Sequence, residues 1–193
     1  FSEEQLRFML ETVDADADRL SRLITELLDA ARIDAGRLTL KRGPVKLDEI
    51  VRHVLTNMSG GSADPFEISI GDDLDLIWGD SDRMTQVVTN LVENALRHGF
   101  GLRQVVVQNT SGEEPGVVLE VLDNGPGIPE EMRQRVFSRF WRAGSGAGSG
   151  LGMYIVRGIV VEHGGTINIT DGPEGGANIQ VWFPINEPDA LTD

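Results

Sequence analysis

The sequence predicts an α+β two-layer sandwich, in which helices cover one face of a mixed, mostly antiparallel sheet, preceded by one long coiled-coil-like helix. Two patterns carry this prediction. A heptad repeat of apolar residues runs through roughly the first 32 residues, which is typical of a helix that packs against another helix. Beyond it, amphipathic helical segments are interspersed with short Val- and Ile-rich runs that are typical of strands. This order of elements favours one helical layer on one sheet.

The composition excludes several function classes. The chain has 193 residues and a formal net charge of −14, which argues against duplex nucleic acid as a partner, because phosphate neutralisation requires clustered Lys and Arg. Since it has no Cys, disulfides, thiol catalysis and thiolate-bound zinc are excluded, and a reducing cytosol is indicated. No apolar run approaches the ~18 residues of a membrane span, and the N-terminus lacks the pattern of a signal peptide. The chain starts without Met inside a helical pattern, so we expect it to be a fragment of a longer protein.

The N-terminal helix carries a narrow apolar seam with alternating spacings of four and three. Its members are Leu6, Leu10, Val13, Ala17, Leu20, Ile24, Leu27 and Ala31. A single helix cannot bury such a seam, so we expect a partner helix, a second copy, or both. A surface helix that docks on its own domain is the alternative. Gly36 is the predicted stop, and residues 41–44 are predicted as a linker, which places a domain boundary after residue 40.

Local patterns predict the remaining elements, which would form a second domain over 44–187 and an acidic, frayed tail over 188–193. The predicted helices are 45–58, a helix that is capped by Asp80 or Ser81 and ends at Gly99, 130–137 and 151–163. The predicted strands are 66–70, 74–78, 103–110, 117–123, 166–170 and 177–184, the last two as a hairpin. Gly-rich or polar loops are predicted at 59–65, 111–116, 123–129 and 140–150.

The helix that ends at Gly99 has two distinct faces. Val87, Val88, Leu91, Val92 and Ala95 form a stripe that can pack on a sheet. On the opposite face, Asn90, Asn94 and Arg97 follow at i, i+4 and i+7, with His98 beside them. Amide oxygens suit a hard cation such as Mg²⁺, and Arg suits phosphate oxygens. A solvated polar face is the alternative explanation of this helix taken alone.

Three later motifs add to this helix. Asp123 leaves an apolar strand into the turn DNGPGIP, where a carboxylate beside open backbone can accept a hydrogen bond from an exocyclic amine such as that of adenine. A plain structural turn is the alternative. Residues 137–142 (FSRFWR) could face a nucleotide or plug a core. Residues 148–152 (GSGLG) feed a helix N-terminus, whose free N–H groups suit phosphate, although no dinucleotide fingerprint or GxxxxGK[ST] loop is present.

In this order the motifs resemble the catalytic ATP-binding domain of bacterial sensor histidine kinases, a branch of the GHKL (Bergerat-fold) ATPases. QVVTNLVENALRHG resembles the N box of that family, DNGPGIP the G1 box, VFSRFWR the F box and GSGLGM the G2 box. The resemblance covers residues 45–184. Residues 1–40 resemble the second helix of the dimerisation and histidine-phosphotransfer hairpin.

The resemblance implies the following roles. Asn94, assisted by Asn90, would hold Mg²⁺ on the ATP phosphates, and Arg97 and His98 would contact phosphate or ribose. Asp123 would accept the adenine amine. The implied catalytic residues are Asn90, Asn94 and Arg97, and the implied ATP contacts are these with His98, Asp123, Gly125, Gly127, Ile128, Phe140, Arg142, Gly148, Gly150, Leu151 and Gly152. The γ-phosphoryl group would pass to a histidine and then to the receiver domain of a response regulator.

The sequence departs from the family pattern in two places. The implied lid at 143–147 (AGSGA) is short and uncharged, so we expect it to be mobile. The phosphoacceptor helix, with its H-E-x-x-x-P motif, is missing, since His53, His98 and His163 lack that context. We therefore expect this chain to bind ATP without phosphorylating itself, within a full-length homodimer whose catalytic part is cytoplasmic and whose membrane anchor, where one exists, lies upstream.

Three alternatives to the kinase remain. A hydrolytic GHKL ATPase would need a general-base Glu where this chain has Asn90, and Glu93 is expected to point about 100° away from Asn94. An anti-sigma-factor serine kinase would not explain the heptad helix. A non-catalytic nucleotide-binding module would not explain the intact motifs.

Overall fold

The computed structural model describes residues 2–58, 67–110, 114–142 and 148–185. The predicted turn at 59–65, the implied lid at 143–147 and the acidic tail at 188–193 lie outside these residues, as does the first half of the loop predicted at 111–116. The elements are α1 (Glu3–Asp34), β1 (Gly43–Val45), α2 (Leu47–Met58), β2 (Glu67–Ile70), β3 (Ile77–Gly79), α3 (Ser81–His98), β4 (Leu102–Thr110), β5 (Gly116–Asp123), α4 (Glu130–Arg133), η1 (Arg135–Phe137), α5 (Gly152–Glu162), β6 (Thr166–Asp171) and β7 (Ala177–Pro184).

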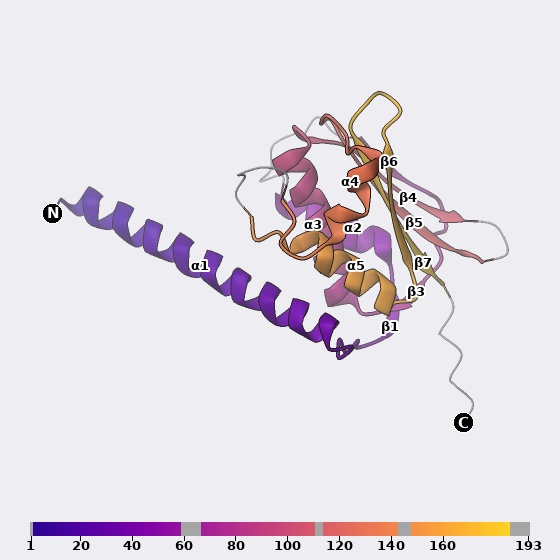
Figure 1. The fold of residues 1–193 in the computed structure, drawn as a ribbon, viewed down its shortest axis with the longest axis horizontal. Coiled ribbons are helices and arrows are strands. Elements are labelled where there is room, and N and C mark those ends of the chain that lie inside the picture. The colour runs from indigo at the N-terminus through magenta and orange to yellow at the C-terminus, as the bar shows by residue number, and fades with distance from the viewer. Residues whose placement is uncertain (1, 59–66, 111–113, 143–147, 186–193) are drawn as a thin grey trace.

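The predicted two-layer α+β class is confirmed. Five strands form a sheet in the order β2-β4-β5-β7-β6, in which only the β2–β4 pair is parallel. Helices α2, α3 and α5 lie on one face of this sheet, and α1 projects from the body (Figure 1). The core fills the space between the layers, and the stripe from Val87 to Ala95 on α3 is buried in it. The sheet therefore forces the other face of α3 outward.

The ends of α3 agree with the prediction. The carboxylate of Asp80 accepts a hydrogen bond from the backbone N–H of Arg83 and caps the first turn, and Gly99 closes the last turn through the carbonyl of Ala95. The hairpin of β6 and β7 is also as predicted, and the predicted strands β4 and β5 pair antiparallel with each other.

The small second sheet corrects the predicted linker. Gly43–Val45 is not a linker but strand β1, paired antiparallel with β3, so that Gly43 faces Gly79. For the same reason α2 begins at Leu47 rather than at residue 45. The strand expected at 74–78 is confined to Ile77–Gly79, and the helix expected at 130–137 is divided into α4 and η1. The pairing of β1 with β3 joins residues more than 30 positions apart, so the pattern of neighbouring residues does not predict it.

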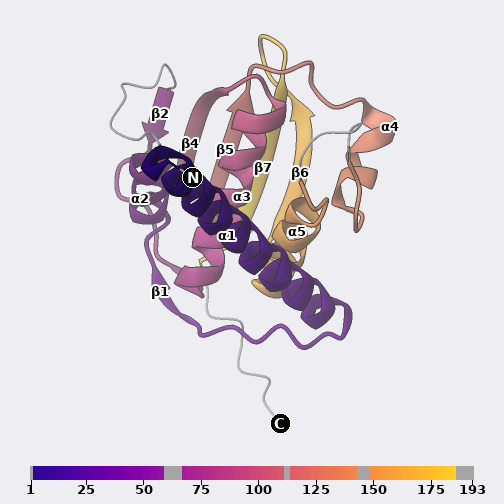
Figure 2. The same ribbon diagram turned by 90° about the vertical axis from the view of Figure 1, so that its left-hand side faces the viewer.

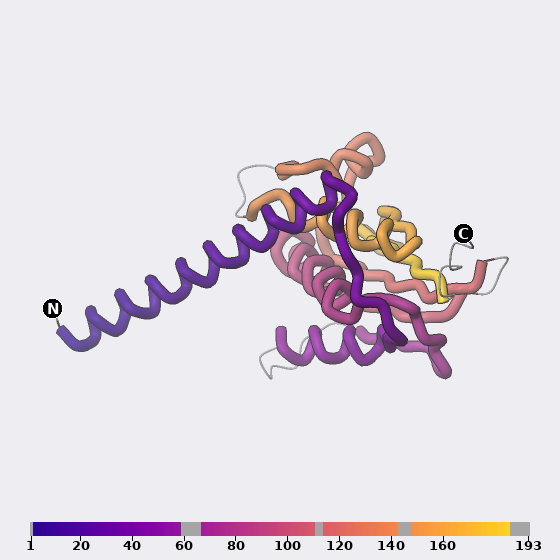
Figure 3. Tube along the Cα trace, turned by 90° about the horizontal axis from the view of Figure 1, so that it is seen from below, coloured from indigo at the N-terminus to yellow at the C-terminus, as the bar shows by residue number. Residues whose placement is uncertain are grey.

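Helix α1 is exposed to solvent over most of its length and packs against the rest of the chain only near its C-terminal end. Most of the heptad seam is exposed; Val13, for example, has an exposed fraction of 65%. The N-terminal turns point away from the body, whereas the last turns cross α3 and α5 (Figures 2 and 3). There Asp29 and Ala30, which are not seam residues, are buried. The last turns of α1 thus dock on the chain's own helical layer, as the alternative expected, whereas the partner expected for the exposed seam stays a prediction.

His163, at the C-terminal end of α5, is hydrogen-bonded to the N-cap residue of α3, which directly follows β3. Its Nε2 accepts a hydrogen bond from the backbone N–H of Asp80 at 3.0 Å, and its Nδ1 lies 2.8 Å from the carbonyl oxygen of Ile159. Burial is the largest cause that lowers the pKa of His163 from its ordinary value of 6.5.

This lowered pKa makes stability dependent on pH. Below about pH 6.5 the unfolded chain binds a proton at His163 that the folded chain does not, so we expect the free energy of unfolding to fall as the pH drops from 6.5 towards the lowered folded pKa. Urea unfolding at pH 7.5 and 5.5 measures the effect. His163→Gln should remove part of this pH dependence, whereas His53→Gln on the exposed face of α2 should retain it.

Candidate functional site

A cleft of about 240 Å³ opens beside the polar face of α3. Strands β5 and β7 form its floor through Val121, Ala177 and Ile179, and the loop before α4 and the residues before α5 form its walls. Its lining combines apolar side chains and the carboxylate of Asp123 with the amides, charged groups and imidazole that α3 contributes. Such a cleft suits a ligand with a flat apolar part and a polar, charged part.

The α3 wall gathers the predicted polar residues. Asn90, Asn94, Arg97 and His98 all border the cleft. Glu93 borders it as well, and its carboxylate lies 3.7 Å from the guanidinium of Arg97. Glu93 was expected to point about 100° away from Asn94, and it still borders the cleft, because the cleft lining includes side chains from more than one side of α3. Burial, followed by the charge of Arg97, lowers the pKa of His98 and favours its neutral form.

Asp123 is held at the end of β5 with one oxygen engaged. Its Oδ1 accepts backbone hydrogen bonds from Gly125 at 2.8 Å and from Ala177 at 2.9 Å. No hydrogen bond to Oδ2 is found among the described residues. The side chain therefore has a fixed orientation and a second oxygen with which to accept a hydrogen bond from a ligand.

Glycines around Asp123 let the backbone approach closely. A Cβ on Gly99 would lie 2.3 Å from the Cβ of Asp123, and a Cβ on Gly125 would lie 2.9 Å from the Cα of Gly99. Gly127 has φ = +76°, which only glycine adopts without strain. The turn after β5 is thus built to bring α3, the carboxylate and the cleft together.

The structure brings eleven of the fourteen residues in the predicted contact set to the cleft. They are Asn90, Asn94, Arg97, His98, Asp123, Gly127, Ile128, Arg142, Gly148, Gly150 and Gly152. Gly125, Phe140 and Leu151 do not border it. Leu151 is buried in the core, and the exposed Phe140 ring lies 5.4 Å from the guanidinium carbon of Arg139. The implied lid lies outside the described residues, so its part in the site stays a prediction.

Several residues that border the cleft were not in the predicted contact set. Met153, Trp141 and Val136 add apolar surface, and Trp141 belongs to a motif that the sequence had singled out. Glu26 comes from α1, more than 60 residues before Asn90. No local signal distinguishes Glu26 from the other acidic residues of that helix, because its position depends on how α1 docks.

Comparisons with known proteins agree with this geometry. The sequence model described as "Histidine kinase-, DNA gyrase B-, and HSP90-like ATPase" matches residues 79–187. The chain is 37% identical to the sensor protein KdpD of Escherichia coli over 85% of its own length and 19% of that protein. It is 35% identical to the probable sensor histidine kinase TcrY of Mycobacterium tuberculosis, over 95% of its length and 39% of that protein.

A solved structure is similar over nearly the whole chain. The crystal structure of full-length ShkA in complex with AMPPNP matches with a TM-score of 0.79 and 26% identity, covering 95% of this chain and 39% of that one. The chain thus spans between about a fifth and two fifths of the length of these relatives.

Proposed function

The chain belongs to the family of histidine kinase-, DNA gyrase B- and HSP90-like ATPases, and from this premise we propose that it is the catalytic ATP-binding region of a sensor histidine kinase. Its membership supports ATP binding, and its curated relatives KdpD and TcrY are a sensor protein and a probable sensor histidine kinase. The activity, substrates and partners of the full-length protein belong to this proposal.

One observation carries the proposal: a single cleft has the features of an adenine site at one end and of a phosphate site at the other. The free oxygen of Asp123 would accept the adenine amine above the floor of Val121 and Ile179. Arg97 and the backbone before α5, at Gly148 and Gly150, would hold the phosphates. The two ends are joined in one continuous cleft, which suits a nucleoside triphosphate.

Mg²⁺ would be held jointly by the protein and the nucleotide. Asn90 and Asn94 present amide groups, which are suitable oxygen ligands, on one side of the cleft. Among the described residues there is no group of three or more His, Asp or Glu that could hold a metal alone. The donor set therefore fits a cation that arrives with ATP, and its chemistry would be to neutralise charge on the phosphates.

We propose phosphoryl transfer to a histidine that these 193 residues do not supply. The bond from the γ-phosphorus to the bridging oxygen of ATP would break, a phosphorus–nitrogen bond to the imidazole would form, and ADP would leave. The protein would act by positioning the triphosphate and stabilising its charge. The phosphoryl group would then pass to an aspartate of a receiver domain.

Two features favour a kinase over a hydrolase. Asn90 occupies the position where the hydrolytic branch needs a general base, and an amide cannot take a proton from water. Glu93 does border the cleft, but it pairs with Arg97, so it is part of an ion pair rather than a free base. The exposed seam of α1 favours a homodimer in the full-length kinase, where the missing hairpin helix and a second copy would cover it.

The same proposal places this region in the cytoplasm, where ATP and receiver domains are found. No helix among the described residues is both long and apolar enough to cross a bilayer.

A labelling experiment tests the proposal. The full-length protein, incubated with Mg²⁺ and γ-labelled ATP, should gain acid-labile label that passes to a receiver domain. The 193-residue chain should bind ATP and stay unlabelled, because His163 is buried and neither His53 nor His98 lies in an H-E-x-x-x-P motif. Acid-labile label on any of these three histidines, or release of free phosphate at a kinase-like rate, would contradict the proposal.

A further inference from the structure

Glu26 is an acidic residue of α1 in a cleft otherwise built by the catalytic domain. It borders the cleft together with Asn90 and Asn94. Its Oε2 atom is buried and has no hydrogen-bond partner among the described residues. A carboxylate accepts hydrogen bonds and donates none, so a buried, unpaired carboxylate oxygen needs a cation or a donor.

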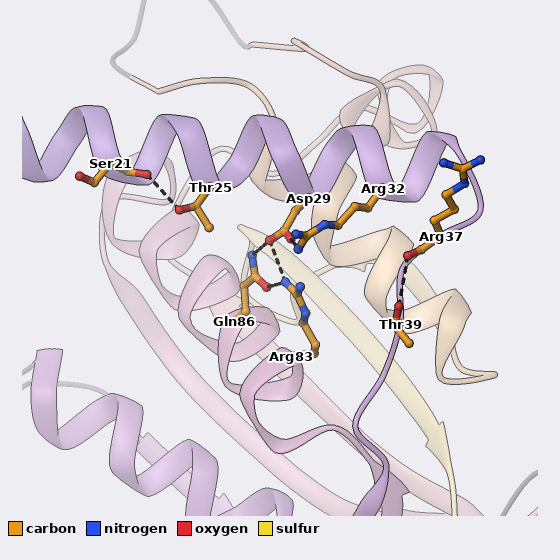
Figure 4. Close-up of polar contacts among 8 residues, drawn as sticks. All are labelled: Ser21, Thr25, Asp29, Arg32, Arg37, Thr39, Arg83 and Gln86. Atoms are coloured by element: carbon orange, nitrogen blue, oxygen red, sulfur yellow. Dashed lines mark hydrogen bonds and ion pairs between the residues drawn. The ribbon is translucent and has the colours of Figure 1, made fainter.

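The position of Glu26 is set by a polar cluster one turn further along α1. The buried carboxylate of Asp29 accepts hydrogen bonds from Arg83 at 2.8 Å and from Gln86 at 2.9 Å, and the guanidinium of Arg83 also donates to the amide oxygen of Gln86 at 2.8 Å (Figure 4). Asp29 is 2% exposed, so this contact is well shielded from water.

Further contacts hold the last turn of α1 on α5 and on the segment that follows η1. The carboxylate of Asp34 accepts hydrogen bonds from Arg139 and from the hydroxyl of Tyr154. Gly158 makes room for Ile33, since a Cβ at Gly158 would lie 2.5 Å from the Cδ1 of Ile33. The docking of α1 is therefore a built interface with polar and apolar parts.

This interface sets the register of α1 against α3. Asp29 contacts Gln86, which lies one turn before Asn90 on α3, and Glu26 lies one turn before Asp29 on α1. Asn90 and Glu26 both border the cleft, which is consistent with the two helices carrying them to the same end of it. That end is where the amides suited to Mg²⁺ lie.

The chemistry of that end favours a cation over a phosphate as the partner of Glu26. Phosphate oxygens are hydrogen-bond acceptors and would repel a carboxylate. The guanidinium of Arg97 is a cation of the cleft that could pair with Glu26, but it already pairs with Glu93. Mg²⁺ keeps several of its waters when it binds a nucleotide, and it is usually held through one or two carboxylates. Those waters are the donors that a carboxylate needs.

We propose that Glu26 is a positioning residue for the metal, contributed by α1, which accepts hydrogen bonds from water bound to Mg²⁺ when Mg²⁺–ATP occupies the cleft. This inference rests on the proposed function. It makes the docking of α1 part of the nucleotide site, so that Mg²⁺–ATP binds more tightly when α1 is docked than when it is released.

The test is the ratio of AMPPNP dissociation constants without and with Mg²⁺, measured by calorimetry on the whole chain. Glu26→Gln should lower this ratio roughly tenfold, as loss of an outer-shell partner of a metal does, and should leave adenosine binding unchanged. Asp29→Asn should lower the ratio as well, because it weakens the docking that brings Glu26 to the cleft. Glu4→Gln, an exposed change on the same helix, should keep the parent ratio.

The outcomes separate the inference from the function on which it rests. An unchanged ratio in Glu26→Gln, or tighter binding of Mg²⁺–AMPPNP by that variant, would overturn the metal role and, in the second case, would show that Glu26 repels the triphosphate. A parent chain that binds no AMPPNP with or without Mg²⁺ would overturn the proposed function itself.

Discussion

Replacing Asn94 by alanine is expected to abolish measurable Mg²⁺-dependent ATP binding. The proposed role of this amide is to hold, together with Asn90, the cation that neutralises the phosphates, so its loss weakens the binding of both the metal and the triphosphate. Hydrogen bonds to charged groups contribute about 1.5–3 kcal/mol each, and the combined loss corresponds to roughly a 100-fold weaker affinity. Calorimetry with Mg²⁺–AMPPNP measures it.

The fold should survive this change. Alanine is a good helix former, and Asn94 lies on the outward face of α3 rather than in the core. Asn57→Ala on α2 is the matched control, because it removes an amide that contacts only His53 among the described partners and lies away from the cleft. Parent-like affinity in Asn94→Ala, with the fold intact, would disprove the metal assignment.

Replacing Asp123 by asparagine is expected to weaken ATP and adenosine binding by roughly 100-fold while pyrophosphate binding changes little. The amide oxygen can still accept the backbone N–H groups of Gly125 and Ala177, so the turn is preserved. The amide nitrogen would then face the adenine amine. Both groups are hydrogen-bond donors, so the hydrogen bond between the carboxylate and the amine would be lost and neither donor would have an acceptor in the cleft.

Asp123→Ala provides a useful contrast. It should lose adenosine binding to a similar extent and also lower the free energy of unfolding, because two backbone N–H groups at the end of β5 lose their acceptor. Equal losses of ATP and pyrophosphate affinity in Asp123→Asn would rule out the adenine role. Competition experiments against a fluorescent nucleotide give all three affinities.

Local patterns were sufficient for most of the elements. The apolar stripe of α3 repeats at the helical period, and its ends carry their own cap residues, so α3 could be predicted with its buried face and its outward face. The hairpin of β6 and β7 could be predicted because its two strands are neighbours in sequence. The polar set on α3 and the carboxylate at the end of β5 could be singled out from residue type and spacing, whereas their nucleotide roles were implied by the family resemblance.

Pairings between distant segments could not be predicted in the same way. Strand β1 looked like a linker because three residues with a proline carry little strand signal, and only its partner β3 makes it a strand. Phe140 belongs to a motif of three aromatics, yet it is exposed while Phe137 is buried. Which aromatic enters the core depends on the path of the chain after η1, which the motif does not encode.

The sequence by itself determined that α3 carries amides and a guanidinium on the face opposite its apolar stripe, because helical periodicity is a property of neighbouring residues. Only the tertiary structure decided which other groups meet that face. Asp123 arrives from β5, and Glu26 arrives from α1 through the docking of Asp29 on Arg83 and Gln86. These contacts depend on how separate elements pack. The free energy of that packing comes from residues throughout the core, so no single segment of the sequence determines it.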